Sequence, residues 1–117
     1  MAITSEIIGK LGGADVEVIP VEGEVSGPRD SLEVLATIDI PAGETWLIAV
    51  IGDMSASSTS SSFAPDLMVG DIKTNRSNTQ DRMTVAGVHT GTVDVKIRKN
   101  SNSGTDSFDG HVYTVKL

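Results

Sequence analysis

The chain has 117 residues, no cysteine and a net charge of −7, from 9 basic and 16 acidic side chains. This length supports one domain with one hydrophobic core. The acidic balance predicts neither a nucleic-acid partner nor a membrane partner, because both need clustered positive charge. The absence of cysteine excludes disulfides and thiolate metal sites, and it fits synthesis in a reducing compartment. No apolar run approaches the roughly 18 residues of a membrane helix, and no secretory signal is visible.

Residues 1–14 are predicted to form an arm that is separate from the domain at 15–117. Ser5 is a suitable cap for a short helical turn that Gly12 and Gly13 would end. The large apolar side chains of this arm are Ile3, Ile7, Ile8 and Leu11. Two arrangements are open, because the arm can dock on its own domain or on a neighbour. The glycine joint permits several directions and favours a neighbour.

The first half of the domain alternates apolar and polar residues with the period of a β-strand. Val16 and Val18 begin this pattern, and residues 22–30 are predicted as a loop because of their glycine and proline content. Residues 32–40 give the clearest alternation, with Leu32, Val34, Ala36, Ile38 and Ile40 on one face. Residues 46–51 are apolar on both faces, which predicts a central strand.

The second half contains shorter strands separated by polar loops. The serine-rich segment 55–65 cannot form a core and is predicted to be an exposed loop. In the final strand, Tyr113, Val115 and Leu117 share one face. The other predicted elements are a strand at 67–72 with a bulge at Gly70, a loop at 74–81, strands at 83–88 and 93–97, a turn at 89–91 and a loop at 100–107.

About seven strands at this spacing predict an all-β domain, an antiparallel β-sandwich for which a jelly roll is one candidate topology. The expected core is made of alternating residues from three of these strands. Its predicted members are Val34, Ile38, Trp46, Ile48, Val50, Val95 and Ile97.

The residues that carry most enzyme chemistry are not arranged for it. The serine run lacks a positioned base and a rigid turn, which a nucleophile needs. His89 and His111 fall on different predicted elements, with no metal-ligand spacing between them. Asn100 to Asp106 is a polar turn with too few carboxylates for calcium. We therefore expect no catalytic site, no metal, no cofactor and no enzyme activity.

The aromatic residues point to packing and partner contacts. Trp46 and Tyr113 are expected in the core, whereas Phe63 lies in a polar loop, where it either folds back onto the core or anchors a partner. The predicted partner-binding residues combine the arm, this loop and the last strand. They are Ile3, Ile7, Ile8, Leu11, Phe63, Tyr113, Val115 and Leu117.

Three segments resemble small virion proteins of tailed bacteriophages. They are ITSEIIGKLGG at 3–13, IPAGETWLIAV at 40–50 and GHVYTVKL at 110–117. Together they cover about a quarter of the chain, and none is a catalytic signature. The resemblance implies a capsid decoration protein or a minor tail protein, made in the host cytoplasm and located in the virion.

The expected function is therefore that of a non-enzymatic virion structural protein, attached through its arm and one face of the sandwich. Its expected partners are other virion proteins, such as the major capsid or tail proteins, and further copies of itself. A homo-oligomer with a trimer favoured follows from the resemblance and from the apolar C-terminal strand. The alternative is a tail-tip adhesin module that binds a host cell-surface glycan. The scarcity of aromatic rings counts against this alternative.

Overall fold

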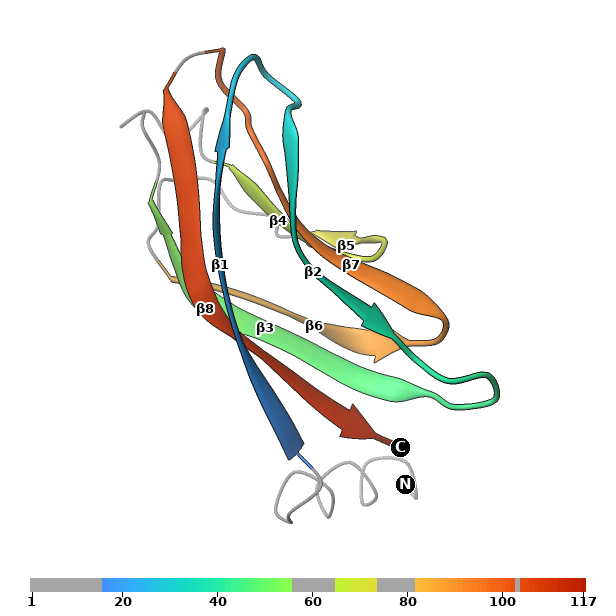
Figure 1. The fold of residues 1–117 in the computed structure, drawn as a ribbon. Helices are drawn as coiled ribbons and strands as arrows, with labels where there is room; N and C mark the ends of the chain where they lie inside the picture. Colours follow the sequence, from blue (N-terminus) through green and yellow to red (C-terminus); the bar gives the residue numbers. More distant parts are fainter. Residues whose placement is uncertain (1–15, 56–64, 74–81, 103) are drawn as a thin grey trace.

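The computed structural model describes residues 16–55, 65–73, 82–102 and 104–117. All regular structure in this part of the chain is β-strand (Figure 1). The strands are β1 (Val16–Ser26), β2 (Leu32–Asp39), β3 (Trp46–Ser55), β4 (Asp66–Val69), β5 (Ile72–Lys73), β6 (Arg82–His89), β7 (Thr92–Arg98) and β8 (Thr105–Lys116).

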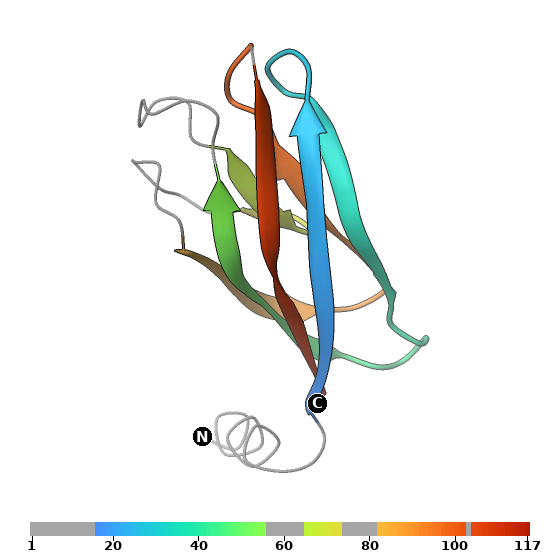
Figure 2. The same ribbon diagram turned by 60° about the vertical axis from the view of Figure 1, so that its left-hand side comes forward.

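The strands form two facing four-stranded sheets. One sheet has the order β1-β8-β3-β6 and the other β2-β7-β4-β5, and every strand pair is antiparallel. Figure 2 shows β1, β8 and β3 in front of the second sheet. This order is that of an eight-stranded jelly roll. The predicted sandwich and its candidate topology are confirmed, and β3 is central as predicted.

The sequence predicted one strand at 67–72, but the structure has two strands in this segment, β4 and β5. This accounts for the eighth strand. Gly70, with a φ of 59°, turns the chain instead of forming a bulge. Because glycine adopts this conformation without steric cost, β4 and β5 form a short hairpin around it. The predicted bulge at Gly70 is therefore wrong.

Strand β1 extends through residues that were predicted to be a loop. Each of its 11 residues lies opposite a residue of β8, with Glu22 opposite Asp109 and Ser26 opposite Thr105. Because Gly23 has no side chain, the side chain of Leu35 from β2 fits against it. A Cβ at position 23 would collide with that side chain. Pairing and packing thus override the local turn signal in 22–26, and the actual turn is limited to the residues after Ser26.

Val34 is not in the core, because the alternation in β2 is interrupted. The register with β7 shifts between Val34 and Ala36, so Leu35 is the extra residue of a β-bulge. Before the bulge, Val34 lies opposite Lys96 and is 49% exposed. After it, Ile38 lies opposite Val93 and is buried. The prediction for Val34 is therefore wrong and that for Ile38 is confirmed.

The core lies between the two sheets and is mostly aliphatic. Trp46 is partly buried against it, and its indole Nε1 donates to Glu44 Oε1 at 2.9 Å. Ile48, Val50, Val95 and Ile97 are buried as predicted. The remaining buried members of the core cluster are Val21, Val25, Ile40, Met54, Leu67, Val69, Met83, Val85, Val93, Phe108 and Val112.

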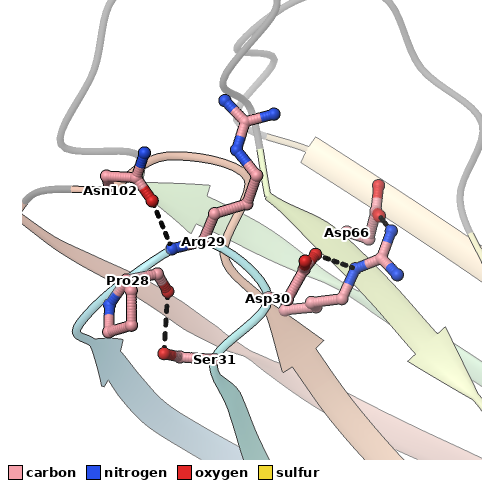
Figure 3. Close-up of polar contacts among 7 residues, drawn as sticks. Pro28, Arg29, Asp30, Ser31, Asp66 and Asn102 are labelled. Atoms are coloured by element: carbon pink, nitrogen blue, oxygen red, sulfur yellow. Dashed lines mark hydrogen bonds and ion pairs between the residues drawn. The ribbon is translucent and has the colours of Figure 1, made fainter.

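A polar network closes one end of the sandwich, where the β1–β2 turn meets the segment after β7 (Figure 3). The backbone N–H of Arg29 donates to Asn102 Oδ1 at 2.9 Å, and the Ser31 hydroxyl donates to the Pro28 carbonyl at 2.7 Å. Asp30 and Asp66 both contact the guanidinium of Arg98. These contacts hold the end of the sandwich in place and serve a structural role.

Several predicted features lie outside the described residues. These are the arm at 1–14 with its four apolar side chains, Phe63 within the serine-rich loop, and the loop at 74–81. The part of the chain that the structure describes contains no helix that would span a bilayer.

Candidate functional site on the outer face of the β1-β8-β3-β6 sheet

The alternation of side chains gives this sheet an inner and an outer face. Ile48 and Val50 of β3 belong to the core, so their neighbours Leu47, Ala49 and Ile51 lie on the opposite face. In Figures 1 and 2, the second sheet lies on the inner side, and none of the described strands lies on the other. This outer face is therefore the side of the domain that the rest of the described fold leaves uncovered.

The strand register arranges the outer face in rows across four strands. One row joins Val16, Val115, Leu47 and Val88, and the next joins Val18, Tyr113, Ala49 and Ala86. The third row contains Pro20, His111, Ile51 and Thr84. We call the apolar members of these rows the apolar half. They are Val16, Val18, Pro20, Leu47, Ala49, Ile51, Ala86, Val88, Tyr113 and Val115.

The next rows form an acidic half. Asp109 of β8 lies directly opposite Glu22 of β1 and Asp53 of β3. Arg82 of β6 pairs with Asp53 across a 2.9 Å ion pair, and Glu24 follows on β1. Because like charges directly opposite each other are destabilising, this half is suited to solvent or to a polar ligand, and less to a protein core.

Exposure within the apolar half differs sharply between its margins and its middle. Val18 on the edge strand β1 is 51% exposed, and Val88 on the edge strand β6 is 53% exposed. Val115 on the central strand β8 is only 1% exposed. The two margins therefore present apolar side chains to solvent.

The outer face of the second sheet has a different character. Cross-strand polar pairs cover much of it: Thr37 donates to Asp94 Oδ1 at 2.9 Å, and Thr92 donates to Asp39 Oδ1 at 3.0 Å. Arg98 and Asp66 form a further ion pair across β7 and β4. Such satisfied pairs are typical of a solvated sheet face. The apolar half of the first sheet has no comparable polar pairs among the described residues.

Three of the predicted partner-binding residues can be placed. Tyr113 and Val115 share the outer face, as predicted, and Tyr113 is half-buried there instead of in the core. Leu117 follows the end of β8, and its backbone N–H donates to the Thr45 carbonyl at 2.9 Å. The other five, Ile3, Ile7, Ile8, Leu11 and Phe63, lie outside the described residues.

The sequence analysis missed the residues from β1, β3 and β6 that join Tyr113 and Val115. A signal for them existed in residues 46–51, which are apolar on both faces. In a two-layer sandwich, only one face of a strand can contact the core. A strand that is apolar on both faces therefore predicts a second covered surface, and Leu47, Ala49 and Ile51 belong to it.

The histidines do not meet. His89 lies opposite Trp46 with its side chain on the inner face, whereas His111 lies on the outer face beside Tyr113, with ring centroids 6.3 Å apart. Among the described residues, no group of three or more histidine, aspartate or glutamate side chains is placed to hold a metal ion.

Comparisons with known proteins give similarity in fold only. No protein-family model and no curated protein matches the chain. One similar solved structure is the CBM36-1 domain of a multidomain xylanase from the hindgut metagenome of Trinervitermes trinervoides, with a TM-score of 0.44 and 13% identity over 84% of this chain and 96% of that chain. Another is a carbohydrate-binding module CBM36 in complex with calcium and xylotriose, with a TM-score of 0.39 and 15% identity over 83% of this chain and 98% of that chain. At these values the likeness is not evidence of function.

Proposed function

We propose that this protein is a non-enzymatic structural component of a bacteriophage particle, attached to other virion proteins and to further copies of itself through the apolar half. The observation that carries the proposal is the row arrangement of ten apolar side chains on an outer sheet face. The assignment to a phage particle rests on the resemblance of the three sequence segments. The jelly-roll topology is compatible with it, because viral capsid proteins and lectins both use this architecture.

The chemistry of the surface favours a protein partner. Contiguous exposed apolar surface on a sheet is typical of protein interfaces, whose centres are depleted in charge and whose rims are polar. The apolar half has this composition, and the acidic half forms one side of its rim. A nucleic acid would need basic groups here, and Arg82 on this face is already paired with Asp53.

Two paired substitutions test the attachment surface. Val18→Glu with Val88→Glu places charges on both margins, where the exposed wild-type side chains contribute little to folding. The matched control is Leu32→Glu with Val34→Glu, since these residues are 51% and 49% exposed on the other sheet. Sedimentation at micromolar concentration should show a wild-type oligomer, with a trimer favoured, a monomer for the Val18/Val88 variant and an unchanged oligomer for the control. A monomeric wild type or an equal effect of both variants would contradict the proposed surface.

The virion assignment has a separate test. Mass spectrometry of purified phage particles should detect the protein, and its measured copy number should be a fixed ratio to the capsid or tail proteins. Absence of the protein from particles would refute the virion role while leaving the self-association result intact.

A glycan-binding module is the second candidate, and one feature favours it. A surface hollow at the border of the two halves is lined by Asp53, Arg82, Asp109, His111 and Tyr113, among other residues. Carboxylates that accept hydrogen bonds and an adjacent aromatic ring are the groups that recognise sugars. Glycan-array binding that is lost in Tyr113→Ala and Asp109→Ala would support this candidate over the structural role.

A further inference from the structure

We propose that the outer face of the β2-β7-β4-β5 sheet binds a short acidic helix of another protein along a row formed by Val34, Lys96, Met68 and Lys73. We call these four residues the basic row. The row lies on the opposite side of the sandwich from the apolar half (Figure 2), so the inference does not depend on the proposed function. It can be tested in the isolated protein, whether or not the protein is part of a particle.

Register and burial place the basic row on the outer face of its sheet. Lys96 of β7 lies opposite Val34 of β2 and opposite Met68 of β4. Met68 in turn lies opposite Lys73 of β5. Both neighbours of Lys96 along β7 are buried in the core, and so are both neighbours of Met68 along β4. Because side chains alternate between the faces of a strand, the four residues form one row across the whole sheet.

The two lysines of the row have no countercharge in the part of the chain that the structure describes. Lys73 and Lys96 form no ion pair there. By contrast, four other described cations each pair with a carboxylate: Arg82, Arg98, Lys99 and Lys116. In a protein with 16 acidic and 9 basic side chains, two unpaired lysines in one row are suited to carboxylates from outside the chain.

The rows on either side of the basic row satisfy their own polar groups. On one side, Arg98 forms its ion pair with Asp66. On the other side, Thr37 donates to Asp94 Oδ1 at 2.9 Å. The two carboxylates nearest to the row are therefore engaged elsewhere. They also limit the size of an anionic ligand, because a nucleic acid or an anionic membrane would place negative charge over both of them.

Apolar surface accompanies the lysines. Val34 is 49% exposed, and Leu32, the preceding outward residue of β2, is 51% exposed. Met68 is half-buried between the two lysines. A methionine side chain adapts its shape to a partner, and lysine stems add apolar contact beneath their charges. A complementary partner therefore combines carboxylates with apolar side chains.

The spacing within the row fits a helix. Neighbouring strands lie about 4.8 Å apart, so Lys73 and Lys96 are about 10 Å apart, with Met68 midway between them. Two glutamates seven residues apart in a helix are also about 10 Å apart, and an apolar residue between them shares their face. In an extended segment, side chains on one face recur about every 7 Å, which does not match this spacing. The partner is therefore a helix with an acidic and apolar stripe.

A synthetic helical peptide tests the surface. The probe carries two glutamates seven residues apart, a leucine midway between them and a fluorophore at one end. One control peptide has glutamine in place of glutamate, and the other has the same composition with the glutamates on opposite faces of the helix. Fluorescence anisotropy should show that the wild-type protein binds the probe, that it binds each control peptide about tenfold more weakly, and that salt weakens probe binding.

Protein variants locate the contact. Lys73→Gln with Lys96→Gln should weaken probe binding about tenfold, because two exposed ion pairs are lost. The matched control, Val18→Glu with Val88→Glu, changes the net charge by the same amount on the other sheet and should bind the probe like wild type. Circular dichroism first establishes that each variant is folded.

The apolar contact has its own variant. Leu32→Glu with Val34→Glu should weaken probe binding and leave the sedimentation of the protein unchanged. Absence of probe binding to wild type, equal binding of the probe and the control peptides, or an equal loss in both charge variants would each overturn the proposal. Stronger binding to phosphatidylserine vesicles or to single-stranded DNA than to the probe would overturn it in favour of a polyanion. A monomeric wild type that binds the probe would refute only the proposed self-association, so the two failures are distinguishable.

Discussion

Lys99 and Asp106 form an ion pair within the interior of the sandwich, with Nζ 3.6 Å from Oδ2 and exposed side-chain fractions of 0% and 1%. Lys99 follows β7 in one sheet and Asp106 lies near the start of β8 in the other, so the pair joins the two sheets at one end. The Lys99 ammonium also donates to the Ser101 hydroxyl at 3.2 Å. Its backbone exchanges hydrogen bonds with Asp30 and Ser31.

Removal of one partner of this pair should be more costly than removal of both. Lys99→Met leaves the Asp106 carboxylate buried without its counter-ion, which is expected to lower the free energy of unfolding by about 3–5 kcal/mol. The double variant Lys99→Met with Asp106→Leu replaces the ions by apolar groups and should recover much of this loss. Urea denaturation measures both. A double variant that is less stable than Lys99→Met would show that the pair contributes more than its own desolvation cost.

Because of the bulge at Leu35, β2 should tolerate a charged substitution before the bulge, at Val34, and not after it, at Ile38. Val34→Asp places a carboxylate on an exposed outer position and should change stability by less than about 0.5 kcal/mol. Ile38→Asp buries an unpaired carboxylate and should cost more than about 3 kcal/mol or prevent folding. Thermal melts of the two variants check this, and equal destabilisation would mean that the alternation runs through β2 without a bulge.

The glycine pair Gly52 and Gly110 marks a close approach of β3 and β8. The two residues lie opposite each other, and a Cβ on Gly110 would lie 2.6 Å from the Gly52 Cα and would also collide with the Ile51 carbonyl oxygen. Because these obstacles are backbone atoms, Gly110→Ala is expected to cost about 3 kcal/mol.

Gly87→Ala on β6 is the matched control. A Cβ at Gly87 would meet the Cδ1 atom of Ile72, and this side chain is 38% exposed and free to rotate away. We expect a change below about 1 kcal/mol, measured by urea denaturation beside Gly110→Ala. If both variants lose equal stability, the close backbone approach at Gly110 is not the cause.

Much of the fold was predictable from the sequence because strand periodicity is a local property. Val93, Val95 and Ile97 alternate with polar residues, and all three are buried opposite β2 and β4. The turn before β7 was also predictable, since Gly91 has a φ of 73° that glycine adopts readily. The apolar sequence of β3 indicated a central strand, and β3 lies between β8 and β6.

The candidate site was only partly predictable. Tyr113 and Val115 were identified from the apolar C-terminal strand, but the sequence does not show which residues lie beside them. Val16 and Leu47 join Val115 through the register of three strands. They are far apart in the sequence, and no local pattern specifies that register.

The sequence by itself determined the strand-forming segments, the absence of disulfides and the all-β class, because each depends on composition and on the alternation of neighbouring residues. The tertiary structure decided where that alternation is interrupted and which face of each strand contacts the core. Leu35 is an extra residue in β2 because Gly23 of the facing sheet leaves room for its side chain, and this reverses the face of Val34. The apolar half exists for a similar reason: one side of β3 contacts the core, so Leu47, Ala49 and Ile51 must face outward with their neighbours on β1, β8 and β6.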